Sequence, residues 1–462
     1  MDIPRDDPLA ALSPLDGRYA DRTAPLVDHA SEAALVRERV RVEGRYLLAL
    51  GGHPDVPVDL DDAEREEIER LVGEFDADDA RLAKRIETEG TERYPATNHD
   101  VKAVEYLVRE HTPERLHPWI HFGLTSEDVN NLARRRLVRG AVTEVLRPAL
   151  GEVRDRLVEL AHEGRDLPML ARTHGQPATP TTFGREMAVY ASRLGRTLGR
   201  VERATAGLSG KLAGASGTYA AHHVALPSVD WPAFAAAFVG SLGLEHEPLT
   251  TQVHPGDDLA RLFDALRGVN GVLLDLDRDA WAYASRRYLG QRSDAAETGS
   301  STMPHKVNPI DFENAEGNLS KADADLAFLG DYVVTSRLQR DLSDSTVKRN
   351  VGAALAHCLV GYTKTAAGLS TVVPNEAAMR ADLDDEPAVL AEAVQTVLRS
   401  AGHGDAYERV KAATRGREVA VEDLRDIVRE ADLPEATRER LLAMEPADYV
   451  GLAPQLAGSV ER

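Results

Sequence analysis

The sequence predicts an all-α protein with a long central helical bundle. Apolar residues recur at helical spacing along most of the chain, and alternating Val/Ile/Tyr segments bounded by turns are scarce. The composition is 43% hydrophobic, 5% aromatic and 28% charged, which is typical of a soluble globular protein built from Ala, Leu and Val helices. At 462 residues, the chain has room for two or three domains or for one extended helical body.

The clearest helix is predicted to follow the stretch GSSTMPHKVNP at 299–309. Asn308 suits the N-cap, Pro309 suits the first helical position, and Asp311 places negative charge at the positive end of the helix dipole. The apolar residues then alternate steps of three and four, as in a helix of a long bundle. They are Phe312, Ala315, Leu319, Ala322, Leu326, Leu329 and Val333.

Two further long helices are predicted for the same bundle. One follows TPTTFGRE and carries Phe183, Met187, Tyr190, Leu194 and Val201 on one face. The other follows HFGLTSEDVNNL, where Thr125 and Asp128 have capping-box spacing, and we expect it to bend at Pro148.

Turn signals divide the chain into three expected domains. Shorter helices broken near residue 51 precede the bundle, and an acidic region of short helices follows it. We therefore predict an N-terminal helical domain at 1–117, a central bundle domain at 118–368 and a C-terminal helical domain at 369–462.

The charge balance limits the partners of the protein. Acidic residues number 76 against 55 basic ones, for a formal net charge of −21, and only eight of the basic residues are lysines. This surface argues against nucleic-acid and anionic-membrane binding. It suits a protein kept soluble where salt screens its self-repulsion, so a salt-adapted host is our hypothesis.

The sequence gives little support to disulfide-bonded, secreted, membrane-spanning or metal-binding classes of protein. The single cysteine, Cys358, excludes an intramolecular disulfide, and its apolar neighbours favour a buried thiol. We expect a soluble, cytoplasmic protein, because neither a signal peptide nor an apolar run of membrane-spanning length is found. Metal-ligand spacing, a Walker loop, a strand-flanked G-x-G-x-x-G and a G-x-S-x-G elbow are also missing, so no metal or cofactor is predicted.

Five polar stretches are candidate sites, each beside an expected helix start. They are SPLDGRY at 13–19, TNHDVKAVEY at 97–106, RTHGQPATP at 172–180, GSSTMPHKVNP at 299–309 and QRDLSDSTVKRN at 339–350. Turn chemistry alone could explain the first three, since Asn, Asp, Pro and Gly all favour turns, and the arginines of the last could simply pair with surface carboxylates. The 299–309 stretch is harder to dismiss, because it places a lysine in a chain that mostly avoids lysine.

Together these stretches resemble a known family. GSSTMPHKVNP resembles the signature loop of the fumarase/aspartase superfamily, whose members cleave C–N or C–O bonds and release fumarate. In this order, the five stretches and HFGLTSEDVNNL resemble the adenylosuccinate lyase family in particular, and the resemblance runs from about Ser13 into the C-terminal region. One local departure is the stretch after Gln252, where His254 and Gly256 replace an acidic residue and a histidine of the family pattern.

The resemblance implies a three-domain helical subunit that assembles as a homotetramer, with each active site built from three subunits. It implies two reactions of purine biosynthesis. Adenylosuccinate gives AMP and fumarate, and the succinylcarboxamide ribotide SAICAR gives AICAR and fumarate.

The resemblance also assigns roles to residues. Ser300 is the expected general base, His174 the general acid, Lys306 and Asn308 hold the substrate, and Glu313 orients the histidine. The remaining expected substrate-binding residues are Arg18, Tyr19, Asn98, His99, Asp100, Thr125, Ser126, Gln252, Asn314, Arg340, Ser345, Thr346, Lys348 and Arg349.

Two alternatives stay open at this point. Another fumarate-releasing lyase, such as argininosuccinate lyase or aspartase, shares the signature loop, but it has no need for a phosphate-binding set at Arg18, Arg340 and Arg349. A helical assembly protein without catalysis is the second alternative, and the intact Ser300 and His174 argue against it.

Overall fold

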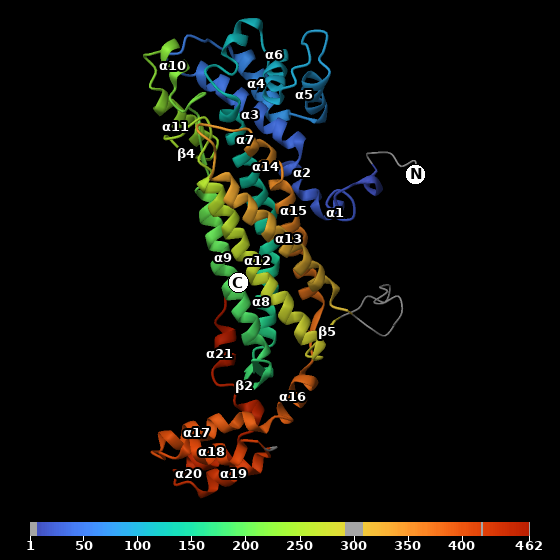
Figure 1. The fold of residues 1–462 in the computed structure, drawn as a ribbon, viewed down its shortest axis with the longest axis vertical. Coiled ribbons are helices and arrows are strands. Elements are labelled where there is room, and N and C mark those ends of the chain that lie inside the picture. Colours follow the sequence, from blue (N-terminus) through green and yellow to red (C-terminus); the bar gives the residue numbers. More distant parts are fainter. Residues whose placement is uncertain (1–6, 292–307, 417–418, 462) are drawn as a thin grey trace. The chain divides into compact units, whose positions relative to one another are not determined.

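The computed structural model describes residues 7–291, 308–416 and 419–461. Contacts divide the chain into two compact units. The first comprises Met1–Ala149, Thr197–Gly271 and Gly317–Tyr362, and the second comprises Leu150–Arg196, Val272–Glu316 and Thr363–Arg462. The described residues are mainly helical, so the all-α prediction is confirmed (Figure 1). The three-domain division stays a prediction.

The first unit begins with helices that pack around α3, which contacts α4, α6 and α7. Ser31 caps the start of α3, where its side chain accepts the Ala34 amide at 3.1 Å. The helices are α1 (Ala20–Thr23), α2 (Val27–Ala30), α3 (Glu32–Gly51), α4 (Asp62–Glu74), α5 (Ala77–Thr88), α6 (Asp100–Glu110) and α7 (Ser126–Gly140). Later segments add β3 (Ser209–Gly210), α10 (Ala220–Ala225), α11 (Trp231–Ser241), β4 (Glu245–His246) and α14 (Ser343–Lys348).

Five long helices have residues in both units. They are α8 (Arg147–Glu163), α9 (Phe183–Ala206), α12 (Asp257–Ser285), α13 (Ile310–Val333) and α15 (Val351–Thr371). The apolar residues predicted to line α13 are all buried, and so are the five predicted on α9. The α13 helix starts at Ile310, one residue later than predicted, while the Pro309 carbonyl still accepts the Glu313 amide at 3.3 Å.

The bend predicted at Pro148 takes a different form. Between α7 and α8, residues Ala141–Leu146 form a π-helical segment, and the α-helix resumes at Arg147. Proline has no amide hydrogen for the carbonyl four residues earlier, and its ring crowds that carbonyl. A widened turn just before Pro148 relieves both effects.

Short strands occur that the sequence pattern did not predict. In the second unit, β1 (Pro168–Thr173) and β2 (Gln176–Thr182) form an antiparallel hairpin with an irregular register between Leu170 and Arg172. Two more pairs are antiparallel β5 (Leu289–Gln291) with β6 (Val372–Pro374), and parallel β3 with β4.

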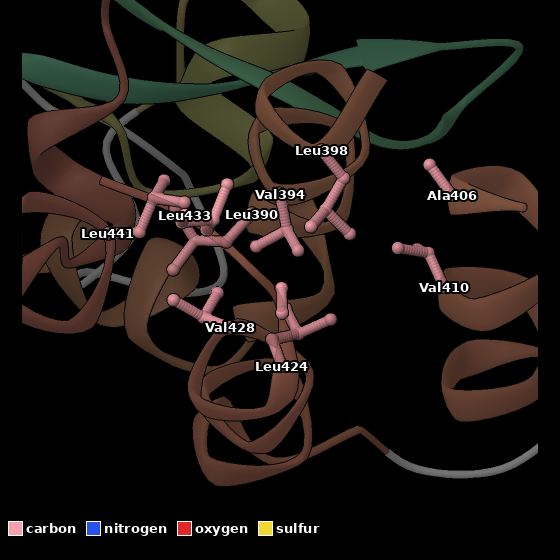
Figure 2. Packing of buried hydrophobic residues seen from close by; sticks show 10 residues of the cluster. Leu390, Val394, Leu398, Ala406, Val410, Leu424, Val428, Leu433 and Leu441 are labelled. Carbon is pink, nitrogen blue, oxygen red and sulfur yellow. The ribbon is translucent and has the colours of Figure 1, made fainter. Parts of the chain in front are cut away.

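The C-terminal helices of the second unit enclose a small core of their own. Figure 2 shows Leu390, Val394 and Leu398 beside Leu424 and Val428 in this core. The helices around this core are α17 (Ala391–Ser400), α18 (Ala406–Thr414), α19 (Val421–Glu430) and α20 (Glu435–Ala443). Two further helices, α16 (Glu376–Asp384) and α21 (Ala453–Gly458), contact β1 and β2 instead. Across the described ranges, none of the helices has both the length and the apolar character that a bilayer crossing requires.

Candidate active site

The start of α7 is fixed by a buried carboxylate. Thr125 is the N-cap, and its amide donates to Asp128 Oδ2 at 2.8 Å. The same carboxylate accepts the two amides of 213–214 at 2.9 and 3.1 Å and pairs with Lys211 Nζ at 2.7 Å. Asp128 and Lys211 are both fully buried. This network holds Thr125 and Ser126 in place at a helix N-terminus, which is a natural position for binding an anion.

The start of α6 lies beside the start of α7. His99 caps α6 by accepting the Lys102 amide on Nδ1 at 3.2 Å, and its Nε2 is 3.5 Å from Ser126 Oγ. Asp100 pairs with Arg39 at 2.7 Å. The preceding residue, Asn98, has a φ of 46°, a left-handed conformation that few residues other than glycine adopt. The structure therefore brings together His99, Asp100 and Ser126, and their role in substrate binding stays a prediction.

A second group of predicted residues gathers around the buried Glu127. Arg340 lies 3.7 Å and Lys348 lies 3.5 Å from this carboxylate. Arg340 also donates to Gln252 Oε1 at 3.2 Å. Lys348 also pairs with Asp344 at 2.6 Å, so two cations and two carboxylates meet here.

Arg349 connects the two groups through its contact with Asp100, at 3.9 Å. Ser345 and Thr346 lie on α14, the short helix that also carries Lys348. Tyr19 is the N-cap of α1, and Arg18 precedes it as an exposed residue. Among the described residues, no contact joins Arg18 to the groups at α6 and α7, so its place in the site stays a prediction.

His174 lies at the tip of the β1–β2 hairpin. His174 and Gly175 are the two residues between the strands, with φ values of 54° and 74°. Positive φ at both positions is the signature of the type I′ turn, whose twist matches that of the flanking strands. His174 is exposed at this turn. The RTHGQP stretch therefore forms a turn and also presents the predicted acid to its surroundings.

The remaining predicted residues lie at or near the start of α13. Asn308 precedes the helix, and Asn314 lies in its first turns. The exposed Glu313 accepts a hydrogen bond from Trp281 Nε1 at 3.1 Å, and no contact within the described residues joins it to His174. The orienting role predicted for Glu313 stays untested. Ser300 and Lys306 lie outside the described residues.

Sequence reasoning missed a titratable pair just before α7. His121 has a φ of 59°, and its Nδ1 is 2.6 Å from Oε1 of the fully buried Glu43. Burial alone lowers the pKa of His121, but the charge and hydrogen bond of Glu43 outweigh it and raise the pKa above its ordinary value. The histidine stands in the HFGLTSED stretch, but nothing in the sequence pairs it with a residue 78 positions away.

His254, where the sequence departs from the family pattern, belongs to a buried hydrogen-bond network two residues after Gln252. Arg135 binds Asp258 with two hydrogen bonds, at 2.7 and 2.8 Å, and reaches His254 Nδ1 at 2.5 Å. Because Nδ1 accepts, the ring proton lies on Nε2, 2.9 Å from Ser209 Oγ. Burial, with the neighbouring Arg135, lowers the pKa of His254 to about 3, so this histidine is neutral.

The first unit contains two helix N-termini and three cationic side chains that can bind anionic groups. The second unit contains His174, an exposed histidine that can donate or accept a proton. Among the described residues, no group of three or more histidine, cysteine or acidic side chains could hold a metal ion.

Comparisons with known proteins show which family this chain is similar to. A family model described as Lyase matches residues 21–322, and one described as Adenylosuccinate lyase C-terminal matches residues 336–450. The adenylosuccinate lyase of Escherichia coli (strain K12) is 44% identical over 453 residues, which cover 96% of this chain and 97% of that protein. Those of Haemophilus influenzae and Dictyostelium discoideum are 42% and 40% identical, covering 97% and 96% of this chain and 98% and 97% of theirs.

Two solved structures share the fold. A 3-carboxy-cis,cis-muconate lactonizing enzyme from Pseudomonas putida has a TM-score of 0.72 at 23% identity, covering 94% of this chain and 95% of that one. A fumarate lyase from Mesorhizobium sp. BNC1 has a TM-score of 0.72 at 21% identity, covering 95% and 96%. At these identities the likeness concerns the fold alone. The Lyase family model, which matches more than half of the chain, places it among the lyases. The relatives that match nearly the full length of the chain at 40–44% identity show more than the fold. This chain belongs to the adenylosuccinate lyase family.

The buried histidines predict how stability depends on pH. Burial also lowers the pKa of His222, to about 4, while a histidine in the unfolded chain titrates near about 6.5. Between these values the unfolded state binds more protons, so the free energy of unfolding rises with pH from about 4 to about 6.5. One histidine contributes up to about 1.4 kcal/mol per pH unit.

Urea unfolding at a series of pH values measures this slope. We expect His254→Gln to reduce the slope of the free energy of unfolding against pH by the equivalent of nearly one bound proton. An equal dependence of the free energy of unfolding on pH in the wild type and in His254→Gln would contradict the conclusion that His254 is neutral in the folded protein.

Proposed function

We propose that this chain is a carbon–nitrogen lyase that eliminates fumarate from adenylosuccinate, giving AMP, and from SAICAR, giving AICAR. The observation that carries the proposal is the gathering of Arg340, Lys348 and Arg349 near the N-termini of α6 and α7, in a family member of net charge −21. A nucleotide carrying a phosphate and two carboxylates needs such a local gathering of donors and cations.

Local cations outweigh the negative charge of the whole chain. Two unit charges 4 Å apart interact by about 4 kcal/mol at an intermediate dielectric, whereas exposed charges farther apart than about 10 Å are largely screened at 0.1 M salt. The carboxylates spread over the surface therefore do little to repel the substrate, and the cations around Glu127 determine whether it binds.

The elimination requires three groups. A base removes the proton from the carbon beside a carboxylate, and the resulting electron pair forms the double bond of fumarate as the C–N bond breaks. The departing electron pair stays on nitrogen and is protonated by an acid. We assign Ser300 as the base, His174 as the acid, and Lys306 with Asn308 as the donors that hold the carboxylate while it gains charge.

Each of these assignments rests on the family motifs, with His174 also supported by its exposed place on a rigid hairpin turn. Serine is a weak base, so neighbouring cations and amide groups have to stabilise its alkoxide. The group at α6 and α7 fits the nucleotide part of the substrate, with Arg18, Tyr19 and the 345–349 segment assigned to its phosphate.

We also assign a homotetramer with shared active sites. Trp281 and Ile310 are 49% and 58% exposed on the chain taken alone, which leaves large apolar side chains for a subunit interface. Within one chain, no contact among the described residues joins His174 to Glu313, the residue assigned to orient it. A second chain that supplies the missing partner accounts for both observations.

The reaction is tested by incubating the purified protein with adenylosuccinate, following ultraviolet absorbance and identifying AMP and fumarate. Ser300→Ala and His174→Ala should each lower turnover at least about a hundredfold without changing the oligomeric state, because each removes one proton-transfer group. Cleavage of argininosuccinate or aspartate, with adenylosuccinate untouched, would instead assign another lyase of the superfamily. Near-native turnover by Ser300→Ala would move the base to Ser301 or His99.

Mixing the two variants tests whether subunits share their active sites. If base and acid come from different chains, a mixed tetramer contains some sites with neither substitution. We expect refolding of Ser300→Ala together with His174→Ala to raise activity at least about tenfold above either variant alone. A mixture no more active than its components, although mixed tetramers have formed, would place both groups on one chain.

A salt series tests the proposed salt adaptation. The acidic residues that give the chain its net charge of −21 repel one another least at high ionic strength. The screening length falls from about 10 Å at 0.1 M salt to about 3 Å at 1 M salt. We expect the temperature of unfolding and the activity to rise with salt between these concentrations. Full stability and activity in dilute buffer would contradict the proposal.

A further inference from the structure

The base of the β1–β2 hairpin is held by apolar packing. Leu170 on β1 lies in a buried cluster with Leu383 of α16 and with Val389. Beyond Leu170 the strand register is irregular, and two residue pairs follow before the turn that carries His174. One of these pairs includes Pro177, which has no amide hydrogen to donate. Neither the packing nor the strand pairing therefore holds the tip of the hairpin as firmly as its base.

An ion pair provides a contact closer to the tip. Arg172, two residues before His174, donates from Nη2 to Asp382 Oδ2 on α16 at 2.7 Å. Among the described residues, Asp382 is the one carboxylate within ion-pair distance of Arg172. The side chains of Arg172 and Asp382 are 19% and 29% exposed, so the pair is largely shielded from water and from screening by salt.

Tyr288 orients the same carboxylate from a third element. Its hydroxyl donates to Asp382 Oδ2, and its carbonyl accepts the Asn375 amide at 2.8 Å. The preceding residue, Arg287, stands just after α12 with a φ of 63°, a left-handed conformation that commonly ends a helix. Tyr288 is buried, so its hydroxyl holds the acceptor oxygen in a fixed place for Arg172.

Asp382 is negatively charged at neutral pH. Burial raises the pKa of its carboxyl, but the hydrogen bonds from Tyr288 and Arg172, with the charge of Arg172, outweigh burial and lower the pKa below its ordinary value. Arg286 adds positive charge nearby. The substitution Asp382→Asn therefore removes a charge that the native side chain has, with little change of shape.

We propose that Asp382 is a positioning residue for His174, because it holds Arg172 and with it the turn on which His174 stands. The inference rests on the proposed role of His174 as general acid, and it goes further, because neither Asp382 nor Arg172 is among the residues assigned above. A proton donor has to lie within hydrogen-bond reach of the departing nitrogen, and a displacement of about 1 Å can lower the rate about a hundredfold. The ion pair thus acts on proton transfer and not on affinity for the nucleotide.

Steady-state kinetics of the intact protein with adenylosuccinate separates this role from substrate binding. Asp382→Asn should lower kcat at least about tenfold while KM changes less than about threefold, because the acid is displaced and the nucleotide-binding residues are untouched. Asp382→Glu keeps the charge and should recover part of the loss. Asp405→Asn breaks a pair of similar length in the same unit, 2.8 Å to Arg409, and should behave as the wild type does.

Two further variants test the route through Arg172. Arg172→Met should lower kcat as much as Asp382→Asn does, and the double variant should lose little more, because both substitutions break one interaction. Tyr288→Phe leaves the ion pair in place and should keep most of the turnover. A larger loss in Tyr288→Phe than in Arg172→Met would overturn the proposal, since Asp382 would then act on the strand that follows Tyr288.

A measurement without substrate keeps this proposal distinguishable from the proposed reaction. Hydrogen exchange of the 168–182 amides, followed by mass spectrometry, should be faster in Asp382→Asn than in the wild type and unchanged in Asp405→Asn. Equal exchange in Asp382→Asn and the wild type, or wild-type kcat in the folded Asp382→Asn, would overturn the proposal. If that variant fails to fold, Asp382→Glu and Arg172→Met provide both readouts. If the wild type leaves adenylosuccinate uncleaved, the proposed reaction fails, and the exchange rates still decide whether Asp382 fixes the hairpin.

Discussion

The Asp128 carboxylate receives hydrogen bonds from the cap of its own helix and from the 213–214 turn, and it pairs with Lys211 in the interior. A buried charge is tolerated only when its lone pairs are satisfied, and this one is fully satisfied. The network fixes the start of α7, where Thr125 and Ser126 stand, and places Glu127 next to them. The cations that approach Glu127, and through them Gln252, therefore depend on a single buried ion pair for their positions.

Charge in this protein is arranged differently near the site and away from it. Over most of the surface, arginines pair with nearby carboxylates, often three or four residues away on the same helix. Such exposed pairs contribute little to stability, but they neutralise positive charge. Around α6 and α7, by contrast, four cations share three carboxylates. The cations are Arg39, Arg340, Lys348 and Arg349, and the carboxylates are those of Asp100, Glu127 and Asp344. A strongly acidic chain thereby keeps a region that attracts anions.

The sequence predicted the parts of the fold that repeat a local pattern. The apolar seam of α13 and the cap of α7 follow from residue spacing, because burial and capping act within a few residues of the chain. The β1–β2 hairpin escaped prediction, since its strands contain prolines and lack alternation, and its turn places histidine where asparagine is usual. Long-range partners such as Glu43 for His121, or Arg135 for His254, leave no local signal. The resemblance supplied Ser300 and Lys306, and the described residues do not test them.

Backbone strain provides a separate line of argument for where the site lies. Among the described residues, six other than glycine have positive φ, and Asn98, His121 and His174 are three of them. All three stand in polar motifs identified from the sequence. A left-handed conformation costs free energy, so it persists where surrounding contacts enforce it, and such residues cluster at functional sites. His174 illustrates this point, because the turn that gives it a positive φ also leaves the residue exposed at the tip of two paired strands.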